Sequence, residues 1–240
     1  MTSPIPRIDF ATTRWSLVAA SERRDTHGQA ALSDLCRVYW QPLYAFLRRS
    51  GSDRQTAEDL TQGFLADLLE RGDLAIATPE RGRFRTFLLA ALKHYAAKQR
   101  AHDQAIKRGG QVTTFSFDFA GAEAAYQFEP TDTRTADEVF DRQWALALLA
   151  SVLEQLETRY RESDRADWFA AMRSTITTGT AAPYTEIASA LGTTPGAVKT
   201  AVGRLRREYR HILDATLADG VDDDADLIDE RRTLFAALAR

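Results

Sequence analysis

The stretch that decides the fold is residues 183–213, PYTEIASALGTTPGAVKTAVGRLRREYRHIL. It predicts a short helix that ends at Gly192, because glycine readily takes the positive φ found at helix ends. A second helix is predicted to begin with Thr194 as its N-cap and Pro195 at its first position, where a missing N–H costs nothing. Apolar residues recur at helical spacing in both segments: Ile187, Ala188 and Leu191 in the first, and Val198, Val202 and Leu205 in the second.

The remaining faces of the second helix are basic. They carry Lys199, Thr200, Arg204, Arg206, Arg207 and Arg210. A short helix, a glycine turn and a basic amphipathic helix are typical of the helix-turn-helix that reads DNA. The N-terminus of a helix offers N–H groups to phosphate, and Lys and Arg supply charge and donors for groove edges. The alternative is a helical hairpin with a solvated basic face.

Nearly every other periodic stretch also predicts a helix, so the expected fold is all-α, with two helical domains joined by a linker. Helices are expected over residues 10–22, 30–49 (with a kink or restart at Pro42), after Ser52 or Asp53, 84–107, from about 137, and 164–177. Residues 72–83 are expected to form a loop, and Gly109-Gly110 to end the 84–107 helix.

The predicted boundaries are an N-terminal extension over 1–29, a first domain over 30–108, a linker over 109–136, a helix-turn-helix domain over 137–213, and an acidic extension over 214–240. The linker has no helical period, and Phe115, Phe117 and Phe119 alternate within it. We expect it to be extended, with its aromatic side chains docked on a partner.

Composition narrows the class of protein. The 240 residues are 44% hydrophobic and 27% charged, which is enough for two cores and excludes a disordered chain. The single Cys36 excludes an internal disulfide and a multi-cysteine zinc site, and its apolar neighbours predict a buried thiol. No membrane-span or signal-peptide pattern is present, so a cytoplasmic protein is expected.

The net charge of −3 hides a local excess of positive charge. Residues 81–108 hold eight basic residues and one acid, Asp103, a balance of 8 − 1 = +7. Phe87, His94, Tyr95 and Gln99 are interleaved with them. Such a helix attracts phosphates and can stack on or bond to unpaired bases; the alternative is an ordinary solvated basic helix.

Three segments resemble the sigma-70 family of RNA polymerase sigma factors, in its small extracytoplasmic-function subfamily. LYAFLRRSGSDRQTAEDLTQGFLADLL (43–69) and FRTFLLAALKHYAAKQR (84–100) resemble its second conserved region, and PYTEIASALGTTPGAVKTAVGRLRREYR (183–210) resembles its fourth. The resemblance covers about residues 30–108 and 137–213. It implies a protein that binds core RNA polymerase and promoter DNA and directs transcription initiation.

The resemblance also implies roles for residues. The helix expected after Ser52 or Asp53, called the acidic helix below, would bind polymerase through Glu58, Asp59, Gln62 and Asp67. The downstream promoter element would meet Lys93, His94, Lys98 and Arg100, and the upstream element would meet Thr194, Lys199, Thr200, Arg204, Arg206 and Arg207. A solvated acidic face is the alternative for the first set. Glu58 and Asp59 point about 100° apart on a helix, so they cannot flank one small substrate as paired catalytic carboxylates.

The sequence departs from the family at Gly63, where an acid usually follows the glutamine. Phosphorylation of the nearby Thr61 by a Ser/Thr kinase would add about −1.5 to −2 charge there; the alternative is a half-buried helix residue. Control by an anti-sigma factor is a further option. So is a brake: the seven acids of residues 219–230 could cover the basic recognition helix, or only keep the chain soluble.

Three other classes of function fit the sequence less well. A stand-alone helix-turn-helix regulator leaves the acidic helix and the first basic helix unexplained, and a pure interaction adaptor would need neither basic helix. A DNA-processing enzyme is less favoured than the regulator, since His27, His94, His102 and His211 show no metal-ligand spacing and no nucleophile or phosphate-loop motif occurs. We therefore expect no catalytic residue, no metal and no cofactor.

Overall fold

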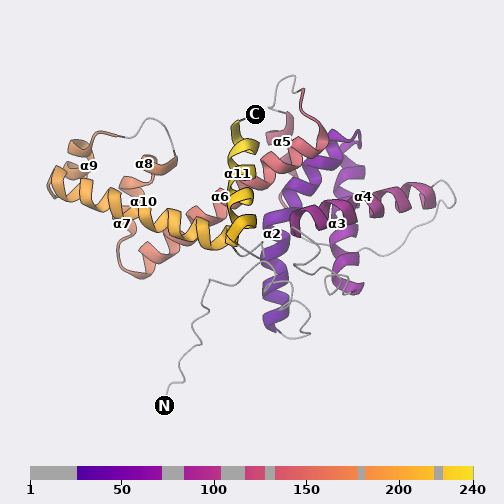
Figure 1. The fold of residues 1–240 in the computed structure, drawn as a ribbon, viewed down its shortest axis with the longest axis horizontal. Helices are drawn as coiled ribbons and strands as arrows, with labels where there is room; N and C mark the ends of the chain where they lie inside the picture. Colours follow the sequence, from indigo (N-terminus) through magenta and orange to yellow (C-terminus); the bar gives the residue numbers. More distant parts are fainter. Residues whose placement is uncertain are drawn as a thin grey trace, which may run out of the picture. The chain divides into compact units, whose positions relative to one another are not determined.

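The computed structural model describes residues 26–71, 84–103, 117–127, 133–177, 182–218 and 224–239, all of them helical or in short connections (Figure 1). The prediction of an all-α fold is confirmed for these residues, which contain no strand. The expected helix at 10–22, the loop at 72–83, Phe115 and the Gly109-Gly110 stop lie outside them. The helices are α2 (Thr26–Arg49), α3 (Arg54–Arg71), α4 (Phe84–Asp103), α5 (Phe119–Gln127), α6 (Ala136–Glu162), α7 (Ala166–Met172), α8 (Ser174–Thr177), α9 (Tyr184–Ala190), α10 (Pro195–Ala218) and α11 (Asp224–Ala239).

The chain divides into two compact units. The first comprises Met1–Leu148 together with Leu217–Arg240, and the second comprises Leu149–Thr216. The boundary falls inside α6 and near the end of α10. The domain limits expected from the sequence stay predictions, and each unit is described by itself.

In the first unit, α2 packs against α3 and α5, and α3 packs against α4. α2 continues through Pro42 without interruption. Its buried face includes Cys36, as expected, and burial raises the pKa of that thiol to about 11. The core is completed by Tyr39, Leu43, Leu47, Phe64, Leu65, Phe84, Leu88 and Leu92.

Side-chain caps fix the starts of α3 and α6 in this unit. Asp53 Oδ1 accepts a 2.8 Å hydrogen bond from the Thr56 backbone N–H, which confirms a cap at 52–53 and lowers the pKa of Asp53. At the start of α6, Thr135 Oγ1 accepts from the Glu138 N–H, and a Glu138 carboxylate oxygen accepts from the Thr135 N–H. This reciprocal capping box sets the entry of α6.

The prediction of an extended segment over 109–136 is wrong for residues 119–127, which form α5. Asp118 caps this helix, since its Oδ1 accepts a 2.9 Å hydrogen bond from the Gly121 N–H. The aromatic side chains dock on the chain itself: Trp40 of α2 stacks on Phe117 and meets Phe119 edge-on. Helical periodicity over only nine residues was masked by the irregular composition around it.

The C-terminal helix α11 is anchored in the first unit by a buried charge pair. Arg85 Nε of α4 lies 2.9 Å from Glu230 Oε1, and the same guanidinium pairs with Asp141 of α6 and lies over the Trp144 ring. Of the α11 side chains that the structure describes, only Glu230 and Leu234 are buried. Glu230 therefore lies on α4 of the first unit, whereas the brake hypothesis expected this acidic stretch on the recognition helix.

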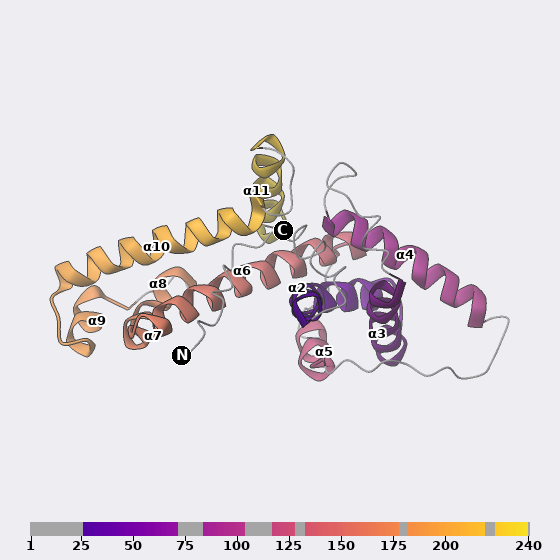
Figure 2. The same ribbon diagram turned by 90° about the horizontal axis from the view of Figure 1, so that it is seen from below.

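The second unit contains the end of α6 with α7, α8, α9 and α10. α10 runs alongside the final part of α6 in the opposite direction (Figures 1 and 2). The single helix expected over 164–177 is instead two, α7 and α8, which meet at Arg173. The core of the unit consists of Val152, Leu156, Tyr160, Phe169, Met172, Ile187, Ala188, Val198, Val202, Leu205 and Ile212.

Candidate nucleic-acid interface

The turn between α9 and α10 is built by backbone hydrogen bonds and one glycine. The Thr193 N–H donates to Ala188 O (2.9 Å) and the Gly192 N–H donates to Ser189 O (3.3 Å). These are the two bonds of a Schellman motif, which needs a left-handed residue after the helix. Gly192 has φ +62°, and a side chain there would meet no neighbour, so the conformation alone explains the glycine.

The start of α10 has the cap that the sequence predicts. Thr194 Oγ1 accepts a 3.2 Å hydrogen bond from the Ala197 N–H, and Pro195 is the first residue of the helix. Val198, Val202 and Leu205 are at most 1% exposed, so the predicted buried face is confirmed. The glycine turn, the N-cap and the buried apolar residues therefore agree, and together they determine which faces of α10 are exposed.

The outer faces of α10 are basic and exposed. Lys199, Thr200, Arg204, Arg206, Arg207 and Arg210 are all exposed. Thr200 Oγ1 donates a 3.1 Å hydrogen bond to Gly196 O of its own helix. Arg206 differs from the others because its NH2 donates a 3.0 Å hydrogen bond to Thr175 O of α8. Its guanidinium therefore ties α10 to α8.

The four predicted DNA residues of α4 are also exposed, but they do not share one face. Lys93 and Arg100 are seven residues apart and so lie on one side, and His94 and Lys98 are four apart and lie on another. Lys93 pairs with Asp137 of α6, and its ammonium lies 5.3 Å from the Phe46 ring centroid. Lys98 and Arg100 therefore carry most of the positive charge that the described part of α4 offers to a ligand.

On α3, the predicted polymerase residues occupy neighbouring positions of the helix surface. Glu58 is half-buried, and its Oε1 accepts a 2.8 Å hydrogen bond from Arg54 Nε, one turn earlier. Asp59 is exposed, and Gln62 is half-buried one turn beyond Glu58. Asp67 lies two turns beyond Asp59, and these separations leave no pair of carboxylates poised on one small substrate.

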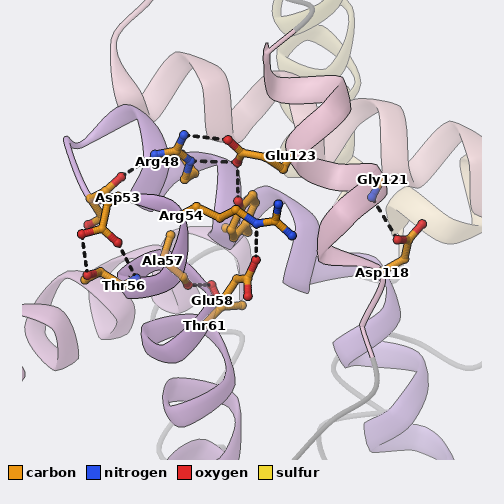
Figure 3. A network of polar contacts seen from close by, with 12 residues as sticks. Arg48, Asp53, Arg54, Thr56, Ala57, Glu58, Thr61, Asp118, Gly121 and Glu123 are labelled. Carbon is orange, nitrogen blue, oxygen red and sulfur yellow. Dashed lines mark hydrogen bonds and ion pairs between the residues drawn. The ribbon is translucent and has the colours of Figure 1, made fainter.

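Thr61 lies on the inner side of α3. Its side chain is 0% exposed, and its hydroxyl donates a 2.7 Å hydrogen bond to Ala57 O (Figure 3). A kinase needs the hydroxyl outside and an extended stretch of chain around it, so this position argues against Thr61 as a phosphorylation site in the folded protein. It is more deeply buried than the half-buried residue that the sequence suggested as the alternative.

A polar network that the sequence did not predict joins α2 to α5 (Figure 3). Glu123, only 4% exposed, accepts bonds from Arg48 Nε (2.9 Å), Arg48 NH2 (2.8 Å) and the Tyr44 hydroxyl. Burial and the neighbouring Glu123 carboxylate raise the pKa of Tyr44. Arg48 NH1 also donates to Ser52 O, so one guanidinium fixes both α5 and the α2–α3 turn. Asp118, whose side chain caps α5, is the residue from which the sequence could have indicated that helix.

Two features are absent from the part of the chain that the structure describes. No group of three or more His, Cys, Asp or Glu side chains there could hold a metal ion. None of the described helices combines the length and apolarity needed to span a membrane.

Comparison with protein-family models, with curated proteins and with solved structures found no match to this chain.

Proposed function

We propose that this protein is a cytoplasmic sigma factor that binds core RNA polymerase and directs promoter-specific transcription initiation. The observation that carries the proposal is the geometry of α9, α10 and the turn between them. It combines a left-handed Gly192, a Thr194 cap and a row of exposed basic side chains on the outer side of α10. That is the arrangement a helix-turn-helix needs to enter the major groove.

Each part has one task in this proposal. α10 binds the upstream promoter element through Lys199, Thr200, Arg204 and Arg207, with Thr194 at its phosphate-facing end and Arg206 partly committed to α8. α4 offers His94, Lys98 and Arg100 to the downstream element, with Lys93 available once it leaves Asp137. α3 offers Glu58, Asp59, Gln62 and Asp67 to a basic surface of polymerase.

The mechanism is recruitment. Phosphate contacts supply most of the affinity and position the protein, and base-edge contacts from α10 supply the sequence choice. The acidic side chains of α3 select polymerase through charge complementarity, which acts on the rate of association and on partner choice. No residue of this chain changes a covalent bond in the process.

The proposal is tested by adding the purified chain to core RNA polymerase and measuring run-off transcripts from a genomic DNA library. Start sites that appear only with the chain, and share an upstream sequence, would support it. Glu58→Lys with Asp59→Lys should lower polymerase binding several-fold or more. The control has the same charge change on exposed residues of α6, Glu154→Lys with Glu162→Lys. Normal polymerase binding by the α3 variant would overturn the assignment of that helix.

A stand-alone helix-turn-helix regulator is the second candidate. It is favoured by Gly63, which leaves α3 without an acid where the sigma family usually has one. The two candidates differ in one measurement, since only the sigma factor requires core polymerase for its effect on transcription. Sequence-specific DNA binding with no polymerase binding would select the regulator.

A further inference from the structure

A groove lies beside α10 in the second unit. It has a volume of about 270 Å³ and is formed by Tyr160 from the end of α6, Arg165, Trp168 and Met172 from the α7 segment, and Ala197, Thr200, Ala201 and Arg204 from α10. Two of its lining residues, Thr200 and Arg204, belong to the basic face already described. The groove is thus continuous with that face.

The electrostatics of the groove favour an anion. Arg165 and Arg204 are both exposed and come from different elements. Burial raises the pKa of the Tyr160 phenol, and the Glu208 carboxylate raises it further, whereas both arginines act on the same hydroxyl in the opposite direction. Two of the charged groups that act on the Tyr160 phenol are therefore guanidinium groups, and one is a carboxylate.

A strained turn places Arg165 at this position. α6 ends in a Schellman motif, in which the Asp164 N–H donates to Arg161 O (3.1 Å) and the Arg165 N–H donates to Tyr160 O (2.8 Å). Asp164 takes the left-handed conformation with φ +55°, where glycine is the usual residue. The turn thus holds the Arg165 backbone N–H on Tyr160 O, and both residues line the groove.

The rest of the lining is apolar and aromatic. Met172 is fully buried, Trp168 is half-buried, and Ala197 and Ala201 leave room beside α10. The volume lies below the roughly 300 Å³ at which pockets for whole small ligands begin. The groove therefore suits a fragment of a larger molecule that has an anionic part and an apolar part side by side.

We propose that this groove holds a backbone phosphate and the adjoining deoxyribose of the DNA strand that flanks α10. Arg165 and Arg204 bind the phosphate oxygens, and Trp168 with Met172 packs against the sugar. When a helix enters the major groove, the strand backbones pass along its sides. Ala197, Ala201 and Arg204 lie on one such side, next to Thr200 on the outer face. This inference rests on the proposed DNA binding and extends the interface to α7, outside the helix-turn-helix.

The test uses the full chain and two unrelated 20–30 base-pair duplexes, because a backbone contact is independent of sequence. Affinity is measured between 50 and 200 mM salt for wild type, Arg165→Gln, Arg165→Lys, Trp168→Ala and the control Arg173→Gln, which removes an exposed charge at the end of α7. Thermal unfolding followed by circular dichroism monitors folding in every variant.

Loss of one phosphate contact lowers the slope of log affinity against log salt by about 0.9, and affinity at low salt by roughly threefold or more. We expect Arg165→Gln to show this loss equally on both duplexes, and Arg165→Lys to retain the slope. Trp168→Ala should weaken binding with the slope unchanged, since an apolar contact releases no counterion. Arg173→Gln should change little.

Equal behaviour of Arg165→Gln and Arg173→Gln, while Lys199→Ala and Arg204→Ala still weaken binding, would overturn the groove proposal and leave the proposed function intact. Weaker binding of Arg165→Gln to core polymerase with unchanged DNA binding would also overturn it, and would identify an acidic protein segment as the occupant. Absence of salt-dependent DNA binding in wild type would overturn both proposals.

Discussion

The hydroxyl oxygen of Tyr95 lies 2.5 Å from the position that a Cβ atom on Gly63 would occupy. Gly63 belongs to α3 and Tyr95 to α4, and the Tyr95 ring also lies 5.7 Å from the Phe64 ring. Gly63 is four residues from Asp59 and four from Asp67, so all three lie along one side of α3. A phenol thus covers the point on the acidic helix where a side chain would otherwise project.

This contact predicts that Gly63→Ala changes the free energy of unfolding in opposite directions in the wild-type chain and in a Tyr95→Phe variant. Glycine inside a helix costs about 0.5–1 kcal/mol relative to alanine. Gly63→Ala in the wild-type chain should nevertheless destabilise, by about 1–3 kcal/mol, because the new methyl group overlaps the Tyr95 hydroxyl. In a Tyr95→Phe background the nearest ring atom is 3.5 Å away, so Gly63→Ala should stabilise. Urea unfolding of the four proteins measures the difference, and additive effects would refute the contact.

The second prediction concerns two glycines four residues apart in the α9–α10 region. Gly192→Ala should cost about 1–2 kcal/mol, because alanine must adopt the left-handed φ of +62°. Gly196→Ala should instead stabilise by up to about 1 kcal/mol, since the position is helical and the nearest atom is 3.9 Å away. Denaturant unfolding measures both. Effects of the same sign would contradict the turn geometry.

Local features were predictable because their causes lie within a few residues. The Gly192 turn, the Thr194 cap and the buried Val198, Val202 and Leu205 each follow from periodicity and from the chemistry of a single residue type. The same reasoning predicted the burial of Cys36 and the fold class. The DNA and polymerase roles stay predictions, since exposure and charge permit them without requiring them.

Other features depend on residues far apart in the sequence. Glu123 is 79 residues from Tyr44, and Glu230 is 145 residues from Arg85, so no local pattern marks either contact. α5, α7 and α8 are each at most nine residues long. Helices this short are marginal by themselves, so tertiary packing decides where they begin and end. Thr61 is buried because its face of α3 packs against neighbouring helices, and tertiary packing decides which face that is.

The third prediction concerns Glu123. Removing one member of a buried charge pair costs about 3–5 kcal/mol, because it leaves the other charge without compensation. Arg48 keeps its bond to Ser52 O and is partly exposed, so Glu123→Ala should cost somewhat less, about 2–4 kcal/mol. Hydrogen exchange should rise across α5 and at the α2–α3 turn. The control is Glu157→Ala, which removes a largely exposed ion pair and should cost below about 1 kcal/mol. Equal costs for the two variants would contradict the role of Glu123.

The final prediction concerns pH and Asp141. Burial raises the pKa of this carboxyl; Arg85 of α4 opposes the rise, while Glu230 of α11 and Asp137 of α6 add to it. The folded protein therefore binds the Asp141 proton more tightly than the unfolded chain, so this contribution to the free energy of unfolding is present at low pH and is lost as pH rises through the raised pKa.

Asp141→Asn removes the titration. Urea unfolding between pH 4 and 8 should show wild type losing stability relative to Asp141→Asn as pH rises, whereas the control Asp229→Asn, on α11, should follow wild type. A constant difference between wild type and Asp141→Asn across this range would mean that Asp141 titrates alike in both states, and that its pairing with Arg85 offsets the burial.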